Sequence, residues 1–223
     1  MEKQIKGIIF DMDGTLVDSM GYWRHIGTLC LESMGKKPDR EEFDQLVYRM
    51  KTSEIVELFA RYGIKISSRK EYEELYYSAM KPCYEKVEPM PGILDVLQEF
   101  RSRGLKMCVA TATRSDVAVP VLERLGIMPY MEFLLCCDDV KAGKDKPDIY
   151  LEAAKRLGLP VSETVVFEDA GYCVDTAKAA GFSVVGILDT TAGEEEIESV
   201  RSNSDLFLEN YGELMQIIRN TVK

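Results

Sequence analysis

Two aspartates stand two residues apart at the end of a short apolar segment, in the run Asp11-Met12-Asp13-Gly14-Thr15. The apolar segment is Ile8-Ile9-Phe10, whose β-branched residues predict a buried parallel strand. In open α/β sheets ligands bind beyond the carboxyl ends of the strands, where two carboxylates offer oxygen ligands to a divalent cation. Gly14 allows the chain to turn sharply there. A calcium-binding EF-hand is excluded, because it needs a preceding helix and a glycine at the sixth loop position.

Thr111 and two lysines are further candidates for contact with an anion. Thr111 ends the apolar segment that begins at Val109, and its hydroxyl can donate to a phosphate oxygen, although threonine is also common in ordinary strands. Lys144 and Lys146 precede a helix that Pro147 is suited to start. Either lysine can neutralise a phosphoryl group, and a solvated surface lysine is the alternative interpretation.

Glu168 and Asp169 place two more carboxylates at the end of a strand-like segment. Carboxylates that cluster in a fold repel each other unless a cation or a proton intervenes. A cation site is therefore one interpretation of this pair. The other is that Asp169 is an ordinary cap at the beginning of a helix.

The elements that must position these residues alternate between strand and helix. After the first strand we expect strands at Met107–Ala110, Phe133–Cys136, Val165–Phe167 and Val184–Ile187. Helices are predicted at Ile93–Arg103, Val117–Leu125, Ile149–Leu157 and Val174–Ala180, each followed by a glycine suited to a left-handed helix end: Gly104, Gly126, Gly158 and Gly181. This alternation predicts an α/β fold with a Rossmann-like, doubly wound parallel sheet that helices cover on both faces.

One long stretch, from about Ser19 to Val87, has helical periodicity and no convincing strand. We interpret it as a separate α-helical domain inserted after the first strand. The predicted boundaries are residues 1–17 for the first part of the core, 18–88 for the inserted domain and 89–223 for the rest of the core.

Composition excludes several classes of protein. The 223 residues carry a formal net charge of −10, which argues against a nucleic-acid binder. No apolar run approaches the ~20 residues that cross a bilayer, and Met1 to Gly7 lacks the apolar stretch of a signal peptide, so we expect no membrane partner and a cytoplasmic location. The six cysteines form no CxxC pair and are expected to be reduced.

The candidate motifs, taken in order, resemble those of the haloacid dehalogenase superfamily of hydrolases. The run from Asp11 to Ser19 is similar to the first motif of that family, Thr111 to the second, Lys144 to the third and Glu168-Asp169 to the fourth. The resemblance is strongest to the branch with an inserted helical cap, which includes β-phosphoglucomutase and phosphoglycolate phosphatase. The chain departs from the family pattern at Asp145, where the third motif usually has proline, and at Ala170 and Cys173, where the fourth usually has serine and glycine. The first departure weakens the choice of Lys144 over Lys146.

The resemblance implies a phosphatase that works through an aspartyl-phosphate. In that scheme Asp11 is the nucleophile and Asp13 the general acid and base, while Thr111 and Lys144 hold the transferring oxygens. The implied cofactor is Mg²⁺, bound by Asp11, the main-chain carbonyl of Asp13 and Asp169, with Glu168 nearby. A non-enzymatic module on the same fold is disfavoured, because none of these groups is missing.

The implied substrate is a small phosphorylated metabolite. The residues expected to contact it are Thr15, Trp23, Lys51, Thr111, Ala112, Thr113 and Lys144, and the protein is expected to be a monomer or a weak homodimer. The alternative function is a sugar phosphomutase similar to β-phosphoglucomutase. Such mutases have a cap histidine at the position of Trp23, whereas His25 lies two residues further on, about 200° around a helix. We therefore expect hydrolysis to prevail over mutase activity.

Overall fold

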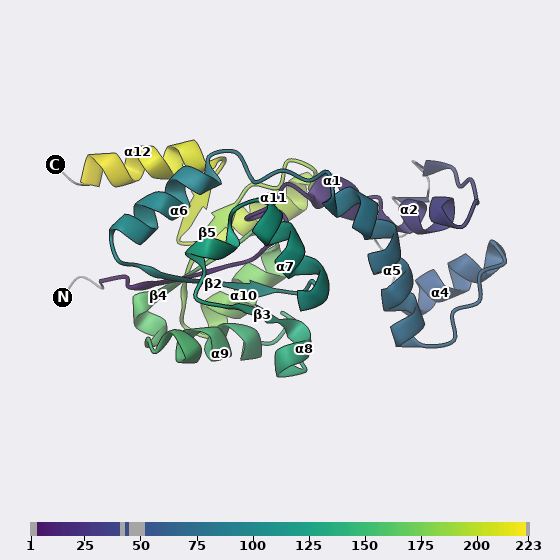
Figure 1. The fold of residues 1–223 in the computed structure, drawn as a ribbon, viewed down its shortest axis with the longest axis horizontal. Helices are drawn as coiled ribbons and strands as arrows, with labels where there is room; N and C mark the ends of the chain where they lie inside the picture. Colours follow the sequence, from purple (N-terminus) through teal and green to yellow (C-terminus); the bar gives the residue numbers. More distant parts are fainter. Residues whose placement is uncertain (1–3, 41–42, 45–51, 222–223) are drawn as a thin grey trace. The chain divides into compact units, whose positions relative to one another are not determined.

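The structure is a computed structural model that describes residues 4–40, 43–44 and 52–221. The chain divides into two compact units, which we call the core unit (Met1–Asp18 with Glu88–Lys223) and the helical unit (Ser19–Val87). Figure 1 shows the elements of both units along the chain.

The core unit contains a six-stranded, fully parallel sheet of order β3-β2-β1-β4-β5-β6. The strands are β1 (Gly7–Phe10), β2 (Lys106–Thr111), β3 (Leu134–Cys136), β4 (Thr164–Glu168), β5 (Ser183–Ile187) and β6 (Leu206–Leu208). This order is that of a doubly wound α/β sheet, in which the first strand lies near the centre. The predicted fold class is confirmed.

Helices cover both faces of this sheet (Figure 1). They are α6 (Ile93–Ser102), α7 (Ser115–Arg124), α8 (Cys137–Val140), α9 (Asp148–Leu157), α10 (Gly171–Ala179), α11 (Glu194–Asn203) and α12 (Tyr211–Thr221), with 3-10 turns η1 (Met128–Tyr130) and η2 (Val161–Glu163). Helices α9 and α10 share one buried cluster with residues of the sheet. Helices α6 and α12 supply aromatic rings to the opposite face.

Successive side chains of a strand point to opposite faces, so a strand covered on both sides must be apolar throughout. Ile9 and Val166 belong to the cluster beneath α9 and α10. Phe10 and Phe167, one residue further along, face the other way, and their ring centroids lie 4.9 Å apart. All four residues of β1 are buried, which explains why its sequence is continuously apolar rather than alternating.

The five predicted strands and four predicted helices are confirmed, with ends that differ by up to three residues. The largest difference is at α10, which begins at Gly171, three residues before the predicted start at Val174. The prediction began too late because the first turn of this helix has no apolar periodicity in its sequence. The four glycines predicted to end helices all have positive φ. Strand β6 and helices α8, α11 and α12 were not predicted, and β6 is a three-residue edge strand.

The helical unit contains α1 (Met20–Trp23), α2 (Ile26–Ser33), α4 (Thr52–Arg61) and α5 (Arg69–Tyr84), and its described residues form no strand. Its interior includes the fully buried Phe59, whose ring stacks on Phe43 with a centroid distance of 6.2 Å. His25, in the turn before α2, pairs its Nδ1 with Asp44 Oδ2 over 2.6 Å, so this histidine is partnered inside the unit.

The two chain segments that lead into and out of the insertion lie side by side within the core unit. Asp18 N donates to Glu88 O over 3.0 Å, and Met90 N donates to Leu16 O over 2.9 Å. All six cysteines are free, as predicted. Among the described residues, no helix combines the length and the apolar character needed to span a membrane.

Candidate active site at the carboxyl ends of β1 and β4

The candidate site lies where the strand order reverses, between β1 and β4, which is the position where doubly wound sheets bind their ligands. The register pairs Phe10 with Phe167, so the next residues, Asp11 and Glu168, are neighbours. Asp11 N continues the ladder by donating to Phe167 O over 3.0 Å. Sheet register therefore brings together two motifs that lie far apart in the sequence.

The loop after Asp11 closes on itself. Gly14 has φ +80°, a conformation that side chains other than glycine rarely adopt, and its amide donates to Val17 O over 2.9 Å. The amides of Leu16 and Val17 both donate to Met12 O, over 2.8 and 2.9 Å. This fixed turn buries Asp11 and leaves Asp13 partly exposed.

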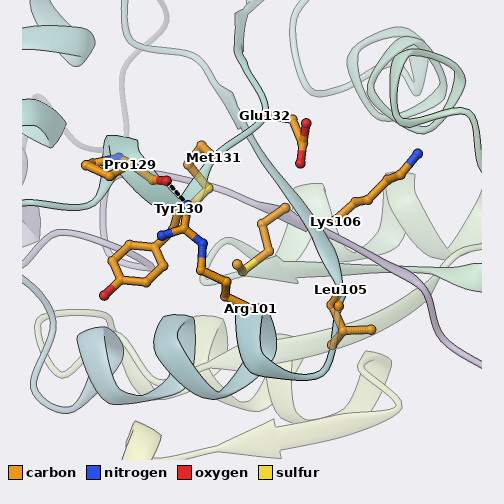
Figure 2. A pocket seen from close by; sticks show the side chains of 9 residues that line it. Arg101, Leu105, Lys106, Pro129, Tyr130, Met131 and Glu132 are labelled. Carbon is orange, nitrogen blue, oxygen red and sulfur yellow. Dashed lines mark hydrogen bonds between the residues drawn. The ribbon is translucent and has the colours of Figure 1, made fainter.

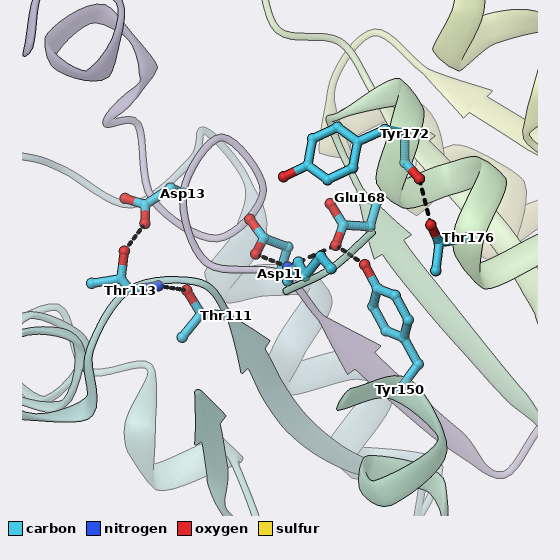
Figure 3. Close-up of polar contacts among 9 residues, drawn as sticks. Asp11, Asp13, Thr111, Thr113, Tyr150, Glu168, Tyr172 and Thr176 are labelled. Atoms are coloured by element: carbon cyan, nitrogen blue, oxygen red, sulfur yellow. Dashed lines mark hydrogen bonds and ion pairs between the residues drawn. The ribbon is translucent and has the colours of Figure 1, made fainter. Parts of the chain in front are cut away.

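A buried ammonium lies between the two motifs. Lys144 Nζ donates to Asp11 Oδ1 and, over 2.7 Å, to Glu168 Oε1. Tyr150 donates its hydroxyl hydrogen to the same Glu168 oxygen over 2.7 Å (Figure 3). Lys144 is 4% exposed, whereas Lys146 is exposed at the surface. Of the two candidate lysines, the structure places Lys144 against Asp11.

Burial and mutual repulsion shift the ionisation of this cluster. Burial, with the charges of Glu168 and Asp13, raises the pKa of Asp11 to about 7, although Lys144 acts in the opposite direction. Burial, followed by the charges of Asp11 and Glu168, raises the pKa of Asp169 well above its usual value. Burial would lower the pKa of Lys144, but Asp11 and Glu168 outweigh it and hold the pKa above the usual value.

The three carboxylates suit a hard divalent cation. Asp11, Glu168 and Asp169 each offer an oxygen, and these oxygens lie within 4.8 Å of one another. Among the described residues these three carboxylates share one ammonium, so the cluster carries surplus negative charge when all three are ionised. An all-oxygen set with surplus negative charge fits Mg²⁺, which prefers carboxylate ligands and water.

Thr111, the last residue of β2, and Thr113, two residues further on, lie on the other side of the first motif. Thr113 Oγ1 donates to Asp13 Oδ2 over 2.6 Å, and the Thr113 amide donates to Thr111 Oγ1 over 3.0 Å. Thr111 accepts this bond and keeps its own hydroxyl proton to donate. Ala112, between them, is exposed. Of the predicted contact residues in this segment, Thr113 contacts Asp13 directly, and Thr111 contacts Thr113.

The other residues predicted to contact the substrate are Thr15, Trp23 and Lys51. Thr15 is fully buried, and its hydroxyl has no hydrogen-bond partner among the described residues. Trp23 belongs to the helical unit, where its indole Nε1 donates to Tyr84 Oη over 3.1 Å. Lys51 lies outside the described residues.

Sequence reasoning missed two buried tyrosines that contact the site. Tyr150 binds Glu168 as described, and Tyr211 donates to the main-chain oxygen of Thr15 over 2.9 Å. For Tyr150 a signal existed, because it stands on the apolar face of the predicted helix, and a buried tyrosine hydroxyl normally finds a partner. Tyr211 gave no such signal, since its helix was not predicted.

A hollow of about 450 Å³ lies at the amino end of β2, away from the site (Figure 2). Its two cations already have partners. Arg101 donates to Pro129 O and lies 4.8 Å from the centroid of the Tyr130 ring, and Lys106 Nζ donates to Leu157 O over 2.8 Å. Glu132 is the one carboxylate among the described residues that line it, so the hollow lacks the group of three carboxylates that marks the candidate site.

Comparison with known families and proteins agrees with this geometry. The family model for haloacid dehalogenase-like hydrolases matches residues 5–181. The fructose-1-phosphate phosphatase YqaB of Escherichia coli is 31% identical, over 84% of this chain and 98% of its own. A phosphorylated carbohydrates phosphatase of Thermotoga maritima is 30% identical, over 79% of this chain and 82% of its own.

Similarity extends to a mutase and to a solved structure. The beta-phosphoglucomutase of Bacillus subtilis is 26% identical, over 92% of this chain and 93% of its own. The crystal structure of CbbY from Rhodobacter sphaeroides in complex with phosphate has a TM-score of 0.74 at 25% identity, covering 95% of this chain and 96% of that one.

Proposed function

The chain belongs to the haloacid dehalogenase-like hydrolases and is a phosphatase of that family, and we propose that it hydrolyses small phosphorylated metabolites through a phosphorylated Asp11, with Mg²⁺ as cofactor. The observation that carries the proposal is the contact of Lys144 with the buried Asp11 at the carboxyl end of β1. A carboxylate held beside an ammonium can meet an anionic phosphate with less repulsion than one that stands alone.

In the first step an oxygen of the Asp11 carboxylate bonds to phosphorus while the bond from phosphorus to the leaving oxygen breaks. Asp13 supplies the proton that the leaving oxygen takes. In the second step water attacks phosphorus, Asp13 accepts the proton of that water, and the bond to Asp11 breaks to release inorganic phosphate. Splitting one displacement into two is the advantage of a covalent route, and proton transfer by Asp13 contributes about 10²–10⁴ in rate.

Asp13 is suited to this part because its carboxyl is partly exposed and its orientation is fixed. Thr113 holds Asp13 Oδ2 over 2.6 Å. Thr111, which keeps its hydroxyl proton, and Lys144 are proposed to bind oxygens of the transferring phosphoryl group. The amides of the turn after Asp13 are proposed to assist them.

The proposed ligands of Mg²⁺ are the carboxylates of Asp11 and Asp169 and the main-chain carbonyl of Asp13, with Glu168 nearby. When bound, the ion offsets the repulsion between the anionic nucleophile and the phosphate. The raised pKa values of Asp11 and Asp169 support this assignment, because burial and then neighbouring carboxylates disfavour their ionised forms and a bound cation would offset both effects.

We further propose that the substrates are sugar phosphates or similar small esters, because two of the similar proteins act on phosphorylated carbohydrates and fructose 1-phosphate. The similarity to a beta-phosphoglucomutase keeps sugar phosphomutase as the second candidate. Hydrolysis is favoured over it by the helical unit. Trp23 occupies the position of the mutase histidine, and its indole nitrogen is bonded to Tyr84, while His25 is bonded to Asp44.

The proposal is tested with p-nitrophenyl phosphate and a panel of small phosphate monoesters, with Mg²⁺ and with a chelator. We expect release of inorganic phosphate that depends on Mg²⁺ and on Asp11. Turnover that is unaffected by complete removal of the metal would contradict the proposed cofactor.

A further inference from the structure

We infer that Tyr150 is a positioning residue of this site, which holds the Glu168 carboxylate in the orientation that keeps Lys144 against Asp11. The inference rests on the proposed function of Asp11 and Lys144, and it adds a residue from helix α9 that has no charge at the site. Tyr150 touches neither substrate nor nucleophile in this scheme and acts through Glu168.

The first observation is a shared acceptor. Glu168 Oε1 accepts the Tyr150 hydroxyl hydrogen over 2.7 Å (Figure 3). The same oxygen accepts an ammonium hydrogen of Lys144 over 2.7 Å. Two donors on one carboxylate oxygen fix its position from two directions. A buried carboxylate needs such bonds, because leaving an ionised group unpaired in the interior is costly. Tyr150 supplies one of them without adding charge.

The second observation is that Tyr150 cannot easily turn away. It is fully buried, and its ring meets that of Phe182 edge-on, with a centroid distance of 6.3 Å and an angle of 62°. It is part of the apolar cluster between the sheet and helices α9 and α10. The hydroxyl is thus anchored to the rigid core.

The third observation links the tyrosine to the lysine. Lys144 Nζ lies 5.8 Å from the centroid of the Tyr150 ring, within range of a cation–π attraction. Lys144 has a long, flexible side chain with a compact ammonium, so its position depends on its partners.

Removal of the hydroxyl therefore leaves Glu168 Oε1 with Lys144 as its donor, and the two charged side chains can shift together away from Asp11. Tyr150→Phe keeps the ring and deletes only the hydroxyl. The matched control is Thr164→Val, which deletes a buried hydroxyl that donates to Pro160 O over 3.1 Å at the opposite end of the same strand as Glu168.

We expect Tyr150→Phe to lower kcat for p-nitrophenyl phosphate by about tenfold, the effect of one lost hydrogen bond to a charged group. The kcat of Thr164→Val should stay within about twofold of the wild-type value, because this variant also loses a buried hydroxyl but at a position away from the site. Tyr150→Met, which also lacks the hydroxyl, should lose activity like Tyr150→Phe and guards against an effect peculiar to one variant.

A double-mutant cycle separates positioning from general support of the fold. If Tyr150 acts by placing Lys144, Tyr150→Phe should change kcat by less than about twofold in a Lys144→Ala background. An equal loss in both backgrounds, or no loss in the wild-type background, would overturn the inference. Asp11→Asn is measured in the same assay. If Asp11→Asn stays active, the proposed function fails and this inference fails with it. If Asp11→Asn is inactive while Tyr150→Phe is fully active, the inference alone is refuted.

Discussion

The ammonium of Lys144 donates a hydrogen bond to Oδ1 of Asp11, although 133 residues separate the two in the chain. Both side chains are buried, so water weakens this attraction little. Lys144 also donates to Glu168, so it keeps a charged partner when Asp11 is replaced.

Asp11→Asn should lower turnover by at least about 10³-fold, because an amide is not a competent nucleophile toward phosphorus. The fold should persist, since asparagine has the same shape and removes a charge from a crowded cluster. The measurement is kcat on purified protein together with circular dichroism. Asp95→Asn, the same change at an exposed position in the first turn of α6, should behave as wild type. Steady turnover by Asp11→Asn, free of contaminating phosphatase, would refute the covalent mechanism.

Lys144→Ala should lower kcat/KM by about 10²-fold or more, the usual loss when one donor to a developing charge is removed. Lys146→Ala is the natural control, because Lys146 is exposed and only two residues away. It should stay within about twofold of the wild type, as surface substitutions usually do. The kinetics of both variants decide the matter, and a larger loss at Lys146 would reverse the assignment made from the structure.

Asp169→Ala should raise the Mg²⁺ concentration that gives half-maximal activity by at least about tenfold. Mutation of residues that only support a metal ligand already lowers metal affinity by about 10–100-fold. Excess Mg²⁺ should recover part of the activity. A magnesium titration of the variant beside Asp95→Ala provides the comparison. Superimposable titrations would remove Asp169 from the proposed metal site.

The stabilisation of the protein by Mg²⁺ should be larger at pH 8 than at pH 5. Without metal, the pKa of Asp11 rises on folding from 3.8 to about 7, and that of Asp169 rises as well. Between these values the folded protein binds more protons than the unfolded chain, so the contribution of these groups to stability is present at low pH and is lost as pH rises through about 7. Mg²⁺ binds the deprotonated carboxylates and therefore stabilises most where they are ionised.

The measurement for this pH dependence is the difference in Tm with and without saturating Mg²⁺ at the two pH values. Asp169→Asn should lose most of the shift at pH 8, which separates this site from weak binding of the ion elsewhere. A shift that is equal at both pH values would show that Asp11 and Asp169 do not govern the binding of Mg²⁺.

The choice between phosphatase and mutase is tested with β-glucose 1-phosphate and a trace of glucose 1,6-bisphosphate. We expect release of inorganic phosphate to exceed formation of glucose 6-phosphate, because the helical unit has Trp23 rather than histidine at the mutase position. Both products are measured in the same reaction. Rapid formation of glucose 6-phosphate, ahead of phosphate release, would favour the mutase.

Much of the fold was predictable because each central strand is apolar along its whole length and each covering helix is apolar on one face. Strand β1 illustrates the first case and α6, with Ile93, Val96 and Leu97 buried, the second. Strand β6 was not predictable, because two of its three residues are only partly buried and it pairs with β5 alone. Its existence depends on a neighbour that the local sequence does not reveal.

The candidate site likewise contains residues that the sequence could predict and residues that it could not. Asp11, Glu168 and Asp169 could be found because they follow strands directly, and strand ends meet at one edge of a parallel sheet. Lys144 comes from the loop between α8 and α9. The family resemblance favoured it over Lys146, but the presence of Asp145 weakened that choice. Only the three-dimensional path of that loop sends Lys144 inward and Lys146 to the surface.

The central place of β1 in the sheet has a consequence for biosynthesis. Its two neighbours begin at Lys106 and Thr164, and the whole helical unit is translated before the first of them. At about 5–20 residues per second, a ribosome that has made Phe10 needs several seconds to reach Lys106. Throughout that interval the apolar residues Gly7–Phe10 have no strand to pair with, so the nascent chain offers them to chaperones before it can bury them.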